Sequence, residues 1–79
     1  MASVHTPRYR DFLKKLRRAR IEAALTQQDV ARLLKRPQSF VSKCESGERR
    51  VDVVELAEFA SIYEKKVSFF VPVPRRKRV

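Results

Sequence analysis

The chain has 79 residues, of which 43% are hydrophobic, and 19 Lys and Arg against 9 Asp and Glu give it a net charge of +10. This length allows one small domain with a thin core. A single cysteine and a single histidine exclude a disulfide framework and a thiol–imidazole metal cluster within one chain, so we expect no metal and no cofactor. No apolar run has the length of a membrane span and no signal peptide is recognisable, so we expect a cytoplasmic protein.

The basic charge is uneven, because residues 1–20 hold seven basic residues and one acidic residue. Such a balance implies a polyanionic partner, with nucleic acid favoured over an acidic membrane. The alternative is that the charge only keeps the surface solvated.

We expect a flexible N-terminal tail at residues 1–6, a helical domain at residues 7–71 and a basic tail at residues 72–79. Thr6 and Pro7 suit the N-cap and first position of a helix, and apolar residues then recur at helical spacing as far as Ala23. The other face of this helix is basic, which indicates either a solvated face or a phosphate contact.

Residues 25–47 read as two short helices joined by a tight turn. Thr26 is a good N-cap for the first helix, and the run Lys35-Arg36-Pro37 interrupts its apolar pattern. The second helix can begin at Pro37 or Gln38, and Gly47 suits the residue after its end. Val41 and Cys44 face inward in this helix, and the opposite side holds four polar residues: Gln38, Ser39, Ser42 and Lys43.

The C-terminal part of the domain begins with a strong helix start. Asp52 and Glu55 have the spacing of a capping box, and the apolar stripe that follows ends near Lys65. The apolar segment at residues 67–71 is long enough for one helical turn or an extended piece. The run Arg75-Arg76-Lys77-Arg78 adds non-specific attraction to phosphates or forms an inert tail.

Several of these residues together match a known pattern: Arg20, Leu25-Thr26-Gln27, Ala31, Ser42 and Glu45-Ser46-Gly47. The pattern resembles the helix-turn-helix of the lambda repressor/Cro-like (XRE-type) DNA-binding family. The resemblance implies an all-α fold, a compact four- to five-helix domain with a helix-turn-helix motif. The family usually has Gly at position 35 and a buried aliphatic residue at position 36, where this chain has Lys and Arg. A non-Gly residue with positive φ costs about 1 kcal/mol, so the turn is either built differently or tolerates this strain.

The resemblance also assigns roles to individual residues. It implies a structural ion pair between Arg20 and Glu45, and a phosphate contact from Gln27 at the start of the first motif helix. In related proteins the C-terminal stretch commonly forms a dimer contact. We therefore expect Phe69, Phe70 and Val71 to be shared between core and dimer interface, with pure core filling as the alternative.

A major groove accepts one α-helix and presents a different donor and acceptor pattern for each base pair. The second motif helix suits it, and the candidate base-contacting residues are Gln38, Ser39, Phe40, Ser42 and Lys43. Phe40 lies on the flank of that face, where it contacts a thymine methyl or packs against the turn. The candidate phosphate-contacting residues are Gln27, Lys35, Arg36, Arg49 and Arg50.

The sequence therefore predicts a double-stranded DNA-binding transcriptional regulator, a repressor that acts as a homodimer on a palindromic operator. No catalytic residue is predicted, because no nucleophile–base pair or carboxylate dyad is recognisable. One alternative is an antitoxin-type module that binds a partner protein and uses DNA binding for autoregulation. Another is a basic RNA-binding adaptor.

Overall fold

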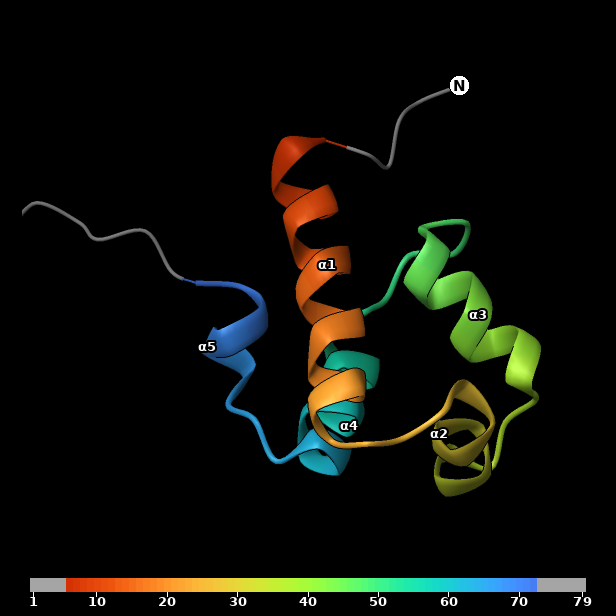
Figure 1. Ribbon diagram of the computed structural model, residues 1–79. Helices are drawn as coiled ribbons and strands as arrows, with labels where there is room; N and C mark the ends of the chain where they lie inside the picture. Colours follow the sequence, from red (N-terminus) through yellow and green to blue (C-terminus); the bar gives the residue numbers. More distant parts are fainter. Residues whose placement is uncertain (1–5, 73–79) are drawn as a thin grey trace, which may run out of the picture.

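The computed structural model describes residues 6–72, which form five helices around one core (Figure 1). The helices are α1 (Pro7–Glu22), α2 (Gln27–Leu34), α3 (Gln38–Ser46), α4 (Val53–Tyr63) and α5 (Val67–Phe70). Residues 6–72 contain no strand, which confirms the all-α prediction. None of these helices is both long and apolar enough to cross a membrane. The predicted tails, including the basic run at residues 75–78, lie almost entirely outside the described range.

The helices begin at the local signals that the sequence contains. The side chain of Thr6 accepts a backbone hydrogen bond from the first turn of α1. At α2, the Asp29 N–H donates to Thr26 Oγ1 over 3.0 Å and the Thr26 N–H donates to Asp29 Oδ2 over 2.9 Å. The same reciprocal capping box joins Asp52 and Glu55 at α4, over 2.7 and 3.0 Å. These bonds satisfy donors that the first turn of a helix leaves free.

The first four helices are followed by left-handed residues, three of which are not glycine. Ala24, Lys35 and Glu64 follow α1, α2 and α4 with φ of 60°, 59° and 56°, and Gly47 follows α3 with φ of 86°. After α2, the N–H groups of Lys35 and Arg36 donate to two carbonyls of the last turn over 3.2 and 2.9 Å. This bonding pattern closes a helix. The turn between α2 and α3 is thus built around a left-handed Lys35, at a cost of about 1 kcal/mol.

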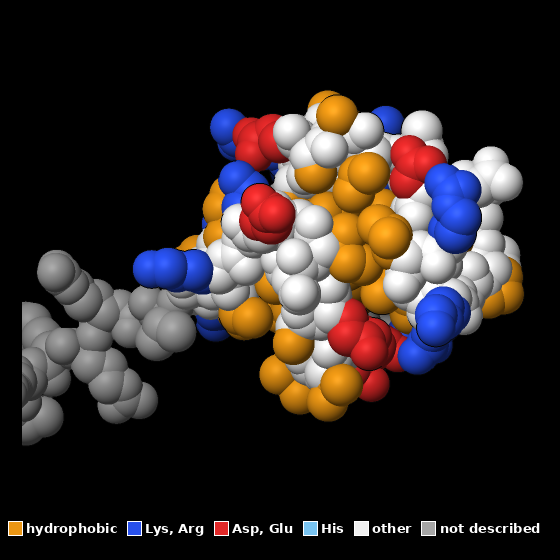
Figure 2. Space-filling model, turned by 90° about the horizontal axis from the view of Figure 1, so that it is seen from below, with side chains coloured by type: hydrophobic (Ala, Val, Ile, Leu, Met, Phe, Trp, Pro, Cys, Tyr) orange, Lys and Arg blue, Asp and Glu red, His pale blue; other side chains and the backbone are white. Residues whose placement is uncertain are grey.

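The C-terminal ends of α1 and α4 meet α2 around a hollow of about 500 Å³ (Figure 2). Its apolar side chains include Leu33 and Ile62. Two of the charged side chains that line it are paired with each other: Glu22 accepts from Lys65, and also from Arg18, over 3.0 Å in each case. Charge at this end of the molecule is therefore largely balanced, unlike in the chain as a whole.

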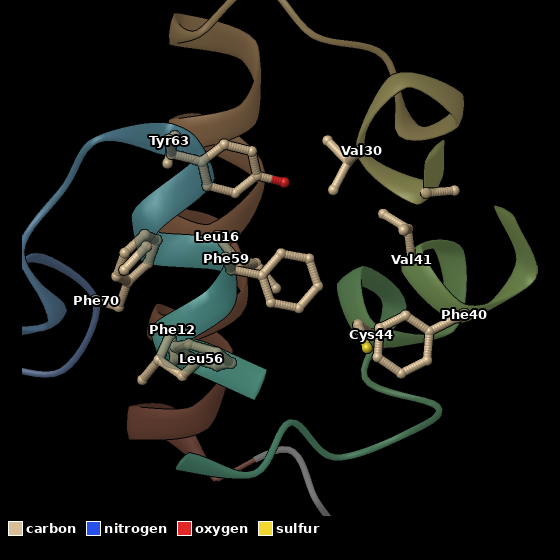
Figure 3. Close-up of a cluster of buried hydrophobic side chains, with 13 residues drawn as sticks. Phe12, Leu16, Val30, Phe40, Val41, Cys44, Leu56, Phe59, Tyr63 and Phe70 are labelled. Carbon is tan, nitrogen blue, oxygen red and sulfur yellow. The ribbon is translucent and has the colours of Figure 1, made fainter. Parts of the chain in front are cut away.

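Phe59 of α4 occupies the centre of the core and connects α4 to α3 (Figure 3). Its ring lies parallel to that of Phe40, with centroids 6.3 Å apart and planes 3° apart, and 6.1 Å from the ring of Tyr63. Phe12 of α1 contacts Phe70 of α5 edge to face, over 6.5 Å. The buried hydrophobic residues are Phe12, Leu16, Ala19, Val30, Ala31, Phe40, Val41, Cys44, Leu56, Phe59, Ala60, Tyr63 and Phe70. Since each large buried side chain contributes about 1.5–3 kcal/mol, this set fixes the position of α3 on the other helices.

Candidate nucleic-acid interface

One face of α3 is polar and exposed. Burial of its apolar residues in the core turns four side chains outward: Gln38, Ser39, Ser42 and Lys43 are all exposed. Within residues 6–72, no hydrogen bond or ion pair occupies these four side chains. This face of α3 therefore has donors and acceptors available to an external partner.

The C-terminal end of α3 is held by a hydrogen-bonded network around Glu45. Arg20 of α1 donates to Glu45 from Nε over 2.7 Å and from Nη2 over 3.1 Å, and from Nη1 to the Leu25 carbonyl over 3.0 Å. The side chains of Arg20 and Glu45 are only 13% and 5% exposed, and the hydrogen bond raises the pKa of Arg20. The network joins α1, the start of α2 and the end of α3, where the family resemblance places an ion pair.

Gln27 belongs to the same network. Its amide nitrogen donates to Glu45 Oε1 over 3.0 Å, and its side chain is partly buried. An amide nitrogen carries two N–H groups, so one remains for a phosphate. Gln27 thus makes a structural contact, and the phosphate contact expected from the sequence stays a prediction.

Phe40 and Arg49 require a correction to the site drawn from the sequence. Phe40 is only 9% exposed and packs on Phe59, so it lies in the core and not on the outer face of α3. Arg49 donates to both oxygens of Glu55, over 2.7 and 2.8 Å, and its guanidinium lies 4.8 Å from the centroid of the Phe40 ring. The hydrogen bonds from Arg49 lower the pKa of Glu55, which is a buried carboxyl. Arg49 therefore connects the loop after α3 to α4, a structural role in place of the predicted phosphate contact.

The other predicted phosphate-contacting residues are exposed at the two ends of α3. Lys35 and Arg36 lie in the turn before it, and Arg50 in the loop after it. The Arg36 guanidinium lies 4.4 Å from the Phe40 ring centroid, so it covers the ring where the family has an aliphatic residue. Arg50 lies in the same way 4.7 Å from the ring of Tyr9. Such contacts orient a guanidinium while leaving its N–H groups free for an anion.

The predicted dimer residues do not share one environment. Phe70 is 1% exposed and packs in the core against Phe12 of α1, as the core-filling alternative expects. Phe69 is partly buried, with Lys65 Nζ 4.6 Å from its ring centroid. Val71 is 41% exposed. Within this stretch, Val71 and the exposed part of Phe69 are the apolar surface that a partner can reach.

Residues 6–72 contain no cluster of three or more His, Cys, Asp and Glu side chains able to hold a metal ion. Cys44 is fully buried, and this burial raises the pKa of its thiol, as expected for a packing residue and not for a reactive thiol.

A family model described as a helix-turn-helix domain matches residues 11–64, more than half of the chain. The chain belongs to this helix-turn-helix family. The family is of the XRE/Cro-like type, so the resemblance seen in the sequence is confirmed. The matched range contains α2 and α3, the network around Glu45 and the ion pair between Arg49 and Glu55. It ends before α5. No match was found among curated proteins or among solved structures. Helix-turn-helix domains that bind DNA place the second motif helix in the major groove, which in this domain is α3.

Proposed function

We propose that this helix-turn-helix protein is a sequence-specific transcriptional regulator that binds double-stranded DNA. The observation that carries the proposal is the outer face of α3, where four exposed polar side chains stand on a helix whose opposite face is buried. A rigid helix with free donors and acceptors is what a major groove accepts.

The base contacts follow from the chemistry of these side chains. Gln38, in the first turn of α3, has the amide geometry that bonds adenine N6 and N7 together. Lys43 reaches the guanine acceptors O6 and N7 as a single charge. Ser39 and Ser42 are short, so the α3 backbone can approach the base edges closely.

Phosphate contacts supply most of the affinity and little sequence information. Lys35 and Arg36 before α3, and Arg50 after it, are exposed cations on either side of the helix. The remaining N–H of Gln27 adds a contact at the start of α2. If a dimer engages about 6–8 phosphates, the logarithm of the affinity falls with a slope of about −0.9 per contact against the logarithm of salt concentration.

One α3 contacts too few base pairs for a specific site, so we propose a homodimer on a palindromic operator. The half-site centres then lie about 10 bp apart, one helical turn of DNA. Such a dimer represses transcription by occupying the promoter, which requires no contact with the polymerase.

A selection from a random duplex library at physiological salt tests this function. The proposal expects an enriched site with two-fold symmetry and half-sites about one turn apart. Enrichment of no common sequence, or tighter binding to structured RNA than to the selected duplex, would contradict it.

The hollow at the lower end of the molecule favours a second candidate function, the antitoxin-type module. Leu33, which lines this hollow, is 58% exposed, and this is apolar surface that a partner protein can cover. The test is coexpression with the protein encoded by the adjacent gene. This candidate requires that the adjacent protein alone stops growth and that the present chain restores it, and growth unaffected by either protein excludes it.

A further inference from the structure

A groove of about 580 Å³ lies between the start of α1 and the end of α5, away from the polar face of α3. Its apolar wall is formed by Phe12, Leu56, Phe70 and Val71. Binding sites of this size commonly hold several apolar side chains or one small ligand.

The two most exposed large apolar side chains in residues 6–72 lie next to this groove in the sequence of α4. Val53 is 75% exposed and Val54 is 65% exposed. Val53 precedes the groove residue Leu56 by three positions on the same helix, so the two side chains lie on the same side of α4. The groove and the valine pair therefore belong to one end of the molecule.

Charged groups divide between these two parts of the surface. Arg8 and Arg50 line the groove, and within residues 6–72 neither is paired with a carboxylate. Asp52 and Glu58 flank the valines, both exposed, and neither is paired with a cation in the same range. α4 itself, from Val53 to Tyr63, contains no Lys or Arg. The chain as a whole has a net charge of +10, so two copies repel each other over most of their surface. Because α4 has no cation, this repulsion is weak where two copies meet at α4.

We propose that this surface is the homodimer contact, with Val53 and Val54 of each copy seated in the groove of the other. The arrangement is isologous, because the same surface carries both the valine pair and the groove that receives it. Asp52 and Glu58 of one copy then face Arg8 of the other. The unpaired acids lie beside the valines and the unpaired bases line the groove, so two copies bring opposite charges together, and the proposed occupant is therefore a second copy.

This inference rests on the proposed function for its biological meaning, since it names the contact that makes the DNA-binding dimer. It also differs from the expectation from the sequence. The sequence placed the contact at residues 69–71 alone. In the proposed contact, Phe70 and Val71 form part of the groove, and the side chains that enter it are the valines at the start of α4.

Sedimentation equilibrium of the full chain without DNA, over a concentration series, tests the contact. Val53→Lys is expected to weaken dimerisation at least about tenfold, because it removes a valine buried in the contact and adds a cation beside the Arg8 guanidinium. The matched control is Leu33→Lys, which adds the same charge to an exposed apolar position in the last turn of α2 and is expected to leave the dimer intact. Thermal unfolding followed by circular dichroism verifies that both variants fold.

A charge exchange gives the sharper result. Glu58→Arg and Arg8→Glu are each expected to weaken the dimer, and the two together are expected to restore it. Glu64→Arg is the control for net charge, because it makes the same change at the other end of α4. The inference is overturned if the wild type is a monomer at every concentration, if Glu58→Arg and Glu64→Arg weaken the dimer equally, or if the double variant is weaker than either single one.

Binding to a duplex with one half-site, measured in parallel, separates this inference from the proposed function. If Val53→Lys remains dimeric while the chain still selects a palindromic site, the contact is elsewhere and the regulator stands. If the charge exchange restores the dimer but no duplex is preferred, the contact stands and the regulator fails.

Discussion

Replacing Arg49 with alanine is predicted to destabilise the fold and not merely to remove a DNA contact. The Glu55 side chain that Arg49 binds through two hydrogen bonds is only 8% exposed. Removing one partner of a buried ion pair leaves the other charge unpaired, at a cost of about 3–5 kcal/mol. Because the Arg49 side chain is itself 39% exposed, water compensates in part, and we expect about 3 kcal/mol.

Urea and thermal unfolding, followed by far-ultraviolet circular dichroism, measure this loss. For a domain of this size 3 kcal/mol lowers Tm by about 12–24 °C. Arg50→Ala is the matched control, since the Arg50 guanidinium is exposed and contacts only the Tyr9 ring among the described side chains, worth about 0.5–1 kcal/mol. That variant is expected to keep its stability and to lose affinity for all duplexes alike.

A second change tests the physical cause. Glu55→Gln in the Arg49→Ala background removes the unpaired charge while glutamine still suits the capping box, so part of the lost stability is expected to return. The reasoning is refuted if Arg49→Ala unfolds within about 0.5 kcal/mol of the wild type while its DNA affinity falls as in Arg50→Ala. Arg49 would then be the phosphate contact that the sequence suggested.

Three further predictions concern local structure. Lys35→Gly is expected to raise the free energy of unfolding by roughly 0.5 kcal/mol, because relief of left-handed strain exceeds the added chain entropy. Lys14→Gly, at an exposed position inside α1, is expected to lower the free energy of unfolding, and the reverse order in urea unfolding contradicts the reasoning. Tyr63→Phe is expected to leave thermal stability unchanged or higher, since the buried hydroxyl has no hydrogen-bond partner within the described range, and a marked loss of Tm would reveal a partner. A hydrogen bond with Thr26 lowers the pKa of Asp29 to about 2. The Asp29 carboxylate therefore stabilises the fold above about pH 4, and this stabilisation is lost as the pH falls towards 2. In an acid titration of unfolding, Asp29→Asn should lack this part of the pH dependence.

The helix boundaries could be predicted from the sequence because their signals are local. Thr26 is the expected N-cap, Asp52 and Glu55 form the expected capping box, and Gly47 has the expected positive φ. Each signal involves residues within one turn of each other, so no knowledge of the rest of the fold is needed. For residues 67–71 the sequence left one helical turn or an extended piece open, and the structure has the helical turn.

The misassigned residues depend on contacts between helices. Phe40 is adjacent in sequence to an exposed serine, and only the position of Phe59 in α4 shows that its ring packs inward. Arg49 looks like any loop cation, because its partner Glu55 already has a local explanation as a capping residue. A buried glutamate needs a cation as partner even when it also caps a helix. The spacing of Arg49 and Glu55 does not identify Arg49 as that cation.

The central claim is that the outer face of α3 distinguishes base pairs, and competition between specific and random duplexes tests it most directly. We predict that Gln38→Ala and Lys43→Ala each reduce the preference for the selected site by about 1–3 kcal/mol and leave thermal stability unchanged. Arg50→Ala is expected to weaken binding to both duplexes equally. Equal losses on specific and random DNA for all three variants would contradict the account.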